Sequence, residues 1–182
     1  MKKVVTLILV GFIGMNGCAA MEQEFQNKIK AAETPIFDSK FDKFTGGKKV
    51  AWSKFHYSNL DLAGKSFDKN FAITTNPKTG KWISSIILMM PSKNHRYLKC
   101  HNTDWLVDGK AIKPIAVLYD SEIRRRPTVH AHEVLTIGFN KESMEALSKA
   151  STIEYRVCND EHTMTDEERS GLKRVYDEAV KP

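Results

Sequence analysis

The sequence has no second long hydrophobic run after its first fifteen residues. The run from Val4 to Met15 is broken only by Thr6 and two glycines. It is shorter than the roughly 20 apolar residues that a transmembrane helix needs. No comparable run follows, so membrane contact is expected only from the N-terminal segment or from surface lysines.

The sequence also lacks the motifs of common enzyme classes. It contains no Gly-x-Ser-x-Gly, no phosphate-binding loop, no dinucleotide-binding fingerprint and no His-Glu-x-x-His. These absences favour a non-enzymatic role, and no cofactor is expected. The formal net charge of +6, or +4 without Lys2 and Lys3, is only mildly basic. No nucleic-acid partner is therefore expected.

The first residues have the pattern of an export signal. Lys2 and Lys3 precede the apolar run, which ends at Met15-Asn16-Gly17-Cys18. This segment resembles the precursor of a bacterial membrane lipoprotein, in which the signal peptide, here residues 1–17, is removed and Cys18 is lipidated. The resemblance implies a membrane partner through the lipid anchor, and Ala19 implies the outer membrane, facing the periplasm or the surface. The alternative is an ordinary secretory signal cut after Ala19 or Ala20, which would give a soluble periplasmic protein.

Cysteine is scarce, with three residues in 182. If Cys18 carries lipid, Cys100 and Cys158 are the remaining pair. In an oxidising compartment such a pair is more often a disulfide than two free thiols. The bridge would add about 3 to 4 kcal/mol of stability in the entropic model. The alternative is that Cys158 is a lone surface thiol.

The chain after Cys18 has the length of one ordinary domain. Residues 18–46 are polar and weakly patterned, which predicts a tether or an arm lying on the domain. Gly46-Gly47 then marks a flexible break. Residues 47–182 are predicted to form a single antiparallel β-rich domain with C-terminal helices.

Strand patterns dominate this domain. Val50 and Trp52 share one face of the first predicted strand, and the turn cluster 76–80 separates two strands of a hairpin. Asp108-Gly109 is the strongest hairpin signal in the chain. Short strands are also expected at 96–100 and 104–107, and a loop at 121–128. The fold class is therefore α+β and strand-dominated, an antiparallel meander or sandwich-like sheet with two short C-terminal helices.

Both helices have recognisable N-terminal caps. Asn140 precedes a helix over 141–149, and Thr165 with Glu168 forms a capping box for the last helix. Between them, Ile153, Tyr155 and Val157 alternate as the buried face of a strand. The stretch from Val134 to Val180 resembles a module of small uncharacterised bacterial envelope proteins, with no activity attached, so the resemblance supports the fold alone.

Two residue clusters are candidate sites. Arg124, Arg125 and Arg126 lie in the predicted loop and could bind an anionic envelope component or protein patch, although most such runs are solvated. His130 and His132 share one face of the next predicted strand and could bind a metal, with His101 or Glu133 as a further ligand. The alternative is a pair of exposed histidines beside a basic loop. No residue is predicted to be catalytic.

Three functions remain compatible with the sequence. The favoured one is an envelope-anchored lipoprotein that binds a protein or envelope component through a sheet edge or the arginine loop. The second is a periplasmic immunity-type or inhibitor-type protein. The third is a metal-dependent hydrolase, which would need a concave pocket that brings His130, His132 and a carboxylate together.

Overall fold

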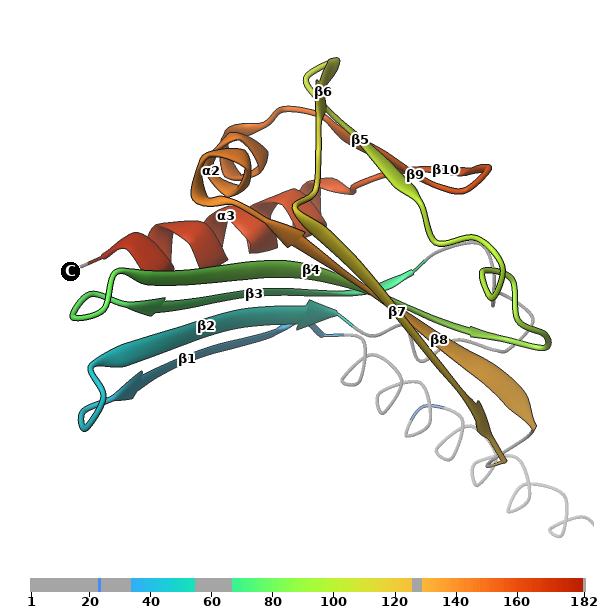
Figure 1. The fold of residues 1–182 in the computed structure, drawn as a ribbon, viewed down its shortest axis with the longest axis horizontal. Coiled ribbons are helices and arrows are strands. Elements are labelled where there is room, and N and C mark those ends of the chain that lie inside the picture. Colours follow the sequence, from blue (N-terminus) through green and yellow to red (C-terminus); the bar gives the residue numbers. More distant parts are fainter. Residues whose placement is uncertain (1–22, 24–33, 55–66, 126–128, 182) are drawn as a thin grey trace, which may run out of the picture.

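The computed structural model describes residues 34–54, 67–125 and 129–181, together with residue 23. Antiparallel strands form a larger sheet of order β1-β2-β3-β4-β8-β7 and a smaller one of order β10-β9-β5-β6 (Figure 1). The predicted α+β, strand-dominated fold class with two helices near the C-terminus is confirmed. The elements are β1 (Ile36–Asp42), β2 (Gly47–Lys54), β3 (Asp68–Asn76), β4 (Lys81–Ser92), β5 (Thr103–Val107), β6 (Lys110–Ile112), β7 (Ala116–Arg124), β8 (His130–Phe139), α2 (Lys141–Lys149), β9 (Ile153–Val157), β10 (Asp160–Thr163) and α3 (Asp166–Val180).

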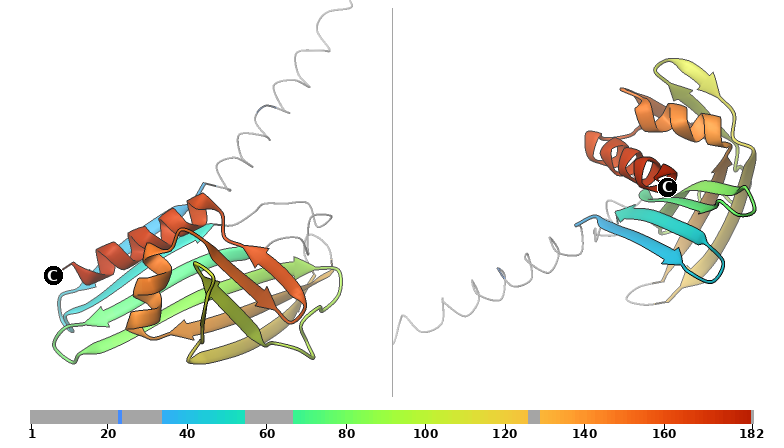
Figure 2. Two further views of the ribbon diagram at one scale, coloured as in Figure 1. Left: turned by 90° about the horizontal axis from the view of Figure 1, so that it is seen from above. Right: turned by 90° about the vertical axis from the view of Figure 1, so that its left-hand side faces the viewer.

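Both helices and the smaller sheet lie on one face of the curved larger sheet (Figures 1 and 2). The core fills the space between these layers. β4 contributes Ile86, Leu88 and Met90, all of them fully buried. Among the described residues, no helix has the length and apolar character needed to cross a membrane.

The first four strands, of which the sequence predicted β2, β3 and β4, form a meander, and then the chain leaves the larger sheet. The turn at Asp108 and Gly109, both with positive φ, closes the β5–β6 hairpin. The Asp108 side chain also accepts hydrogen bonds from the backbone N–H groups of Ser151, at 3.0 Å, and Thr152, at 2.8 Å. These bonds hold the hairpin beside β9, so the smaller sheet forms from β5 and β9. The chain then returns to the larger sheet as β7, the far edge strand, and β8, which lies between β7 and β4 and pairs with both.

Both predicted helix caps are present. The Asn140 side chain accepts a hydrogen bond from the Ser143 N–H, and Thr165 and Glu168 form the reciprocal capping box of α3. Glu168 also pairs with Lys69 of β3 at 2.7 Å, and both side chains are 5% exposed. The buried ion pair therefore fixes the first turn of α3 against the larger sheet.

The buried face of β9 is the one that the alternation predicted. Ile153, Tyr155 and Val157 are all buried. The Tyr155 ring stacks on Trp105 at 4.8 Å between centroids, and Trp105 meets Phe139 of β8 edge-on at 5.3 Å. The smaller sheet therefore joins the core of the larger one through aromatic contacts.

The sheet begins earlier than the expected boundary at residue 47. Residues 36–42, expected in the tether or arm, form β1 and pair along their whole length with β2. Six of the seven residues of β1 are exposed. Because only Phe37 is partly buried, this edge strand lacks the alternation by which buried strands are recognised.

The segment 96–100 is not the strand that was expected. Its backbone N–H groups at Arg96 and Tyr97 each donate to the buried Glu133 carboxylate at 2.8 Å. Cys100 then lies beside Cys158, with the two sulfur atoms 2.07 Å apart. This geometry is consistent with the predicted disulfide, which links the segment to the end of β9.

Candidate functional site

Arg124 does not lie in the loop that was expected. β7 continues through Arg124, which pairs with His130 of β8, so the expected loop over 121–128 is wrong at its start. The Arg124 Nε lies 2.5 Å from the Glu122 carboxylate, so Arg124 already has a counter-charge. Arg125 is exposed just beyond the strand, and Arg126 lies outside the described residues. The predicted cluster therefore offers fewer unpaired cations than its sequence suggests.

The two histidines lie on the expected strand, but neither is exposed. His130 is buried and His132 is half-buried. The His132 Nδ1 lies 3.8 Å from Glu122 Oε1, and burial, followed by the nearby Arg124 charge, lowers the pKa of His132. Glu133 points to the opposite face of β8. Within the described residues, no group of three or more His, Cys, Asp or Glu side chains could hold a metal ion.

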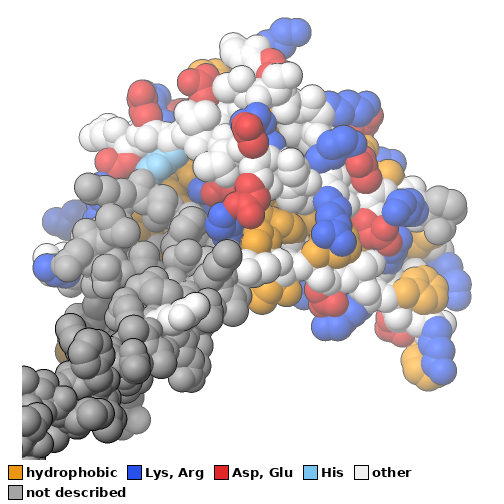
Figure 3. All heavy atoms as spheres, turned by 180° about the vertical axis from the view of Figure 1, so that it is seen from behind, with side chains coloured by type: hydrophobic (Ala, Val, Ile, Leu, Met, Phe, Trp, Pro, Cys, Tyr) orange, Lys and Arg blue, Asp and Glu red, His pale blue; other side chains and the backbone are white. Residues whose placement is uncertain are grey.

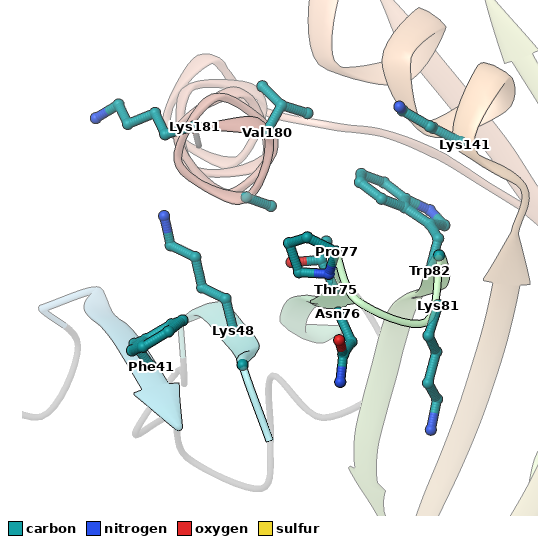
Figure 4. Close-up of a pocket in the computed structure, with 13 residues that line it drawn as sticks. Phe41, Lys48, Thr75, Asn76, Pro77, Lys81, Trp82, Lys141, Val180 and Lys181 are labelled. Carbon is teal, nitrogen blue, oxygen red and sulfur yellow. The ribbon is translucent and has the colours of Figure 1, made fainter. Parts of the chain in front are cut away.

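A groove of about 670 Å³ lies at the end of the larger sheet where its turns meet the helices (Figure 4). The turns after β1 and β3, the first residue of α2 and the last turn of α3 form its walls. Its size is within the range of small-molecule sites. The lining residues are Phe41, Gly46, Lys48, Thr75, Asn76, Pro77, Gly80, Lys81, Trp82, Lys141, Ala179, Val180 and Lys181.

Local sequence chemistry explains how the two turns shape this groove. The Asp42 carboxylate accepts hydrogen bonds from the Phe44 N–H and the Thr45 hydroxyl, and its main-chain oxygen accepts from the Gly46 N–H at 2.8 Å. In the second turn, the Asn76 side chain accepts from the Lys78 N–H. Both turns are thus fixed by short-range hydrogen bonds.

The floor of the groove is apolar. Trp82 is half-buried and contacts the Tyr176 ring edge-on at 6.0 Å. Its indole N–H is buried and has no hydrogen-bond partner among the described residues. Phe41 is 67% exposed and Val180 is 46% exposed. Apolar surface therefore remains open to a ligand on more than one wall.

Lysines form the rim of this groove. The Lys141 ammonium lies 5.6 Å from the Trp82 ring centroid, while Lys81 extends away from α3 (Figure 4). Neither Lys81 nor Lys141 forms a salt bridge in the described part of the chain, although the Lys141 charge helps to lower the pKa of Glu145, which itself pairs with Lys149. Lys48 and Lys181 instead pair with Glu178 of α3. Hydrogen bonds from Lys181 and then from Lys48 lower the pKa of Glu178 to about 2, so this carboxylate is ionised at neutral pH.

Apolar side chains and lysines make up most of the lining of the groove. Its lining residues include no carboxylate, histidine or cysteine, the side chains that most often act as a general base, nucleophile or metal ligand. Aromatic and aliphatic surface beside ammonium groups can instead bind an anion that has an apolar body.

Sequence reasoning missed the groove because its residues come from four separated segments. No lysine stands out within its own segment. The sequence predicted only the helix caps and the turns that position these segments. No protein-family model matches the chain, and no curated protein matches its sequence.

Proposed function

We propose that this protein is an envelope-anchored, non-enzymatic binding protein whose groove takes up an anionic envelope component with an apolar body. One observation carries the proposal: Lys81 and Lys141, neither of which forms a salt bridge within the described part of the chain, border the apolar surface of Trp82, Phe41 and Val180. An anionic amphiphile would supply a negative group that can pair directly with these lysines and an apolar body that covers the exposed apolar surface.

The position of the groove fits an anchored protein. The chain enters the larger sheet at Ile36, and the groove lies beyond the other end of β1, next to Phe41. Seven residues of strand span roughly 20 Å. A lipid on Cys18 would lie N-terminal to Ile36, so the lipid anchor and the groove would be at opposite ends of β1. The ligand is therefore expected from the envelope space or a neighbouring surface.

Binding of octyl phosphate tests the groove directly. The protein is the full chain carrying Cys18→Ser, which receives no lipid, and affinity is measured by isothermal titration calorimetry. Inorganic phosphate and octyl glucoside serve as the anion-only and apolar-only probes. Octyl phosphate should bind more tightly than either, because only it satisfies both the lysines and the apolar floor.

The charge contribution is tested with the double variant Lys81→Ser/Lys141→Ser. An exposed charge pair is worth up to about 1 kcal/mol, so losing two should weaken octyl phosphate binding by roughly tenfold. The matched control is Lys110→Ser/Lys113→Ser, which removes two exposed lysines in and beside β6. Equal affinity for both double variants would show that the groove is not the site.

The anchor itself is a separate part of the proposal, since Cys18 lies outside the described residues. Replacing Cys18 with Ser should move the exported protein from the membrane fraction to the soluble periplasmic fraction. Ala19→Ser is the control and should leave the protein on the membrane. Unchanged membrane association of the Cys18→Ser form would contradict lipidation.

A further inference from the structure

The carboxylate of Glu178 lies between two ammonium groups beside the groove. Lys48 Nζ is 2.9 Å from Oε1, and Lys181 Nζ is 2.8 Å from Oε2. Each carboxylate oxygen therefore has its own cation. The arrangement is a two-lysine anion site in which the bound anion belongs to the protein's own chain.

The Lys48 half of this site stays in place without the Glu178 side chain. Lys48 Nζ also donates a hydrogen bond of 2.7 Å to the main-chain oxygen of Glu178. This bond depends on the path of α3, so it persists when the carboxylate rotates away. The Lys48 side chain is only 17% exposed, which restricts its ammonium to this place. An incoming anion would thus meet a positioned cation.

Glu178 also lies at the boundary between two hollows. Lys48 and Lys181 line the groove, while Glu178 and Lys181 line a second hollow of about 420 Å³ next to Phe37 and Arg174. The Arg174 guanidinium lies 3.8 Å from the Phe37 ring centroid. α3 lies on the side of the molecule away from β7 (Figure 2). Seen from behind, the surface of the molecule carries basic and acidic side chains around exposed hydrophobic side chains (Figure 3).

The Glu178 carboxylate can leave this position without unfolding the helix. The side chain is 24% exposed and belongs to the last turn of α3. Its other side-chain contact is a long hydrogen bond of 3.4 Å from the Ser39 hydroxyl. A phosphate or carboxylate in its place would restore both lysine contacts while Glu178 turns to water.

We infer that Lys48 and Lys181 form an anion subsite of the groove, occupied in the free protein by the Glu178 carboxylate, which the phosphate or carboxylate group of the ligand displaces. This inference rests on the proposed function and deepens it. The ligand has one anionic group, which binds to Lys48 and Lys181, while Lys81 and Lys141 attract the same group from the rim at longer range. The need to displace Glu178 makes binding weaker than the four lysines alone would allow.

The test compares Glu178→Gln with Asp177→Asn, both in the Cys18→Ser chain with octyl phosphate as the probe. Asp177 is the neighbouring residue and pairs with Lys173, so its variant removes the same charge without opening the subsite. Glu178→Gln should bind octyl phosphate at least about fivefold more tightly than Asp177→Asn does. Affinities within twofold of each other would overturn the inference while leaving the groove proposal intact. Absence of binding in every form would overturn both.

A second measurement follows the Glu178 carboxylate itself, in the Cys18→Ser chain that keeps this residue. Carbon-13 labelling of glutamate carboxylates allows the Glu178 resonance to be followed during the titration, with its assignment made from Glu178→Gln. Saturation with octyl phosphate should move this resonance toward the position of an exposed glutamate such as Glu161. A resonance that stays in place while the Trp82 indole signal shifts would show that the ligand binds without displacing Glu178.

Discussion

At the scale of single residues, the buried carboxylate of Glu133 accepts three hydrogen bonds that join β8 to two other parts of the chain. It is 1% exposed and accepts hydrogen bonds from the Arg96 and Tyr97 N–H groups and from the Tyr119 hydroxyl, at 2.8, 2.8 and 2.9 Å. Its two oxygens thereby hold the segment that leads to Cys100. A carboxylate is needed because both oxygens must accept.

Replacing Glu133 with Gln should therefore lower the free energy of unfolding by about 2 kcal/mol. The amide nitrogen cannot accept a hydrogen bond, so a buried N–H loses its partner, at a cost of about 1 to 3 kcal/mol. Urea denaturation measures the change. Glu161→Gln on the exposed side of β10 is the control and should stay within about 0.5 kcal/mol of the parent. A similarly small change for Glu133→Gln would contradict the role given to this carboxylate.

His162 is a second residue with a testable environment. Its ring stacks on Tyr155 at 5.1 Å and meets Phe67 edge-on at 4.9 Å. Its Nε2 is buried and has no hydrogen-bond partner among the described residues. Burial, followed by the Lys69 charge, lowers its pKa below the usual value of 6.5. The other nearby charged groups are Asp160 and Glu168, which oppose the shift, and Arg96, which adds to it.

The lowered pKa of His162 predicts a loss of stability in acid. Between the folded-state pKa and 6.5 the unfolded chain binds more protons, so the stabilisation is complete above pH 6.5 and falls as the pH drops through this window. Melting temperatures from pH 7.5 to 5 should decline less in His162→Gln than in the parent. His132 shifts in the same direction in both proteins, so only the difference reports on His162. Parallel declines would contradict the prediction.

At the scale of elements, the contact between α3 and β2 depends on Gly171. A Cβ atom at this position would lie 2.4 to 2.7 Å from atoms of the Trp52 indole ring. Trp52 cannot move aside easily, because its ring stacks on Phe71 at 5.0 Å with an angle of 11° between the planes. The glycine is thus what lets the helix approach the sheet.

Gly171→Ala should destabilise the fold despite the better helix propensity of alanine. Alanine gains about 1 kcal/mol over glycine inside a helix, whereas overpacking costs about 1 to 3 kcal/mol. A net loss of about 1 kcal/mol in the free energy of unfolding is expected by urea denaturation. Ser170→Ala, one residue earlier and exposed, should be neutral or slightly stabilising. A stabilised Gly171→Ala protein would show that α3 does not pack as described.

The elements that could be predicted from the sequence are those with local causes. The cap at Asn140, the capping box at Thr165 and the turn at Asp108-Gly109 are each set by a few adjacent residues. β1 could not be recognised because six of its residues are exposed, and the end of β7 because it carries Asp120, Glu122 and Arg124. Edge strands owe their structure to a neighbour, which sequence patterns do not show.

At the scale of the whole molecule, the groove is the feature that sequence could not provide. Phe41, Trp82, Lys141 and Val180 meet because two turns of the larger sheet end where α2 begins and α3 finishes. The sequence favoured the arginines at 124–126 as a binding cluster because they are adjacent in the chain, and the structure pairs Arg124 with Glu122. The arginines are neighbours in sequence, whereas the residues of the groove become neighbours only through the arrangement of the elements.

Nuclear magnetic resonance mapping of octyl phosphate tests the central claim most directly, because it locates the ligand without any substitution near the groove. Nitrogen-15 spectra of the Cys18→Ser chain are recorded during the titration. The backbone signals of Gly46 and Gly80 and the indole signal of Trp82 should shift most, while those of Arg125 and Val129 stay unchanged. If the largest shifts instead fall at Arg125 and Val129, the ligand binds beside Arg124 and Arg125, and the function proposed for the groove is wrong.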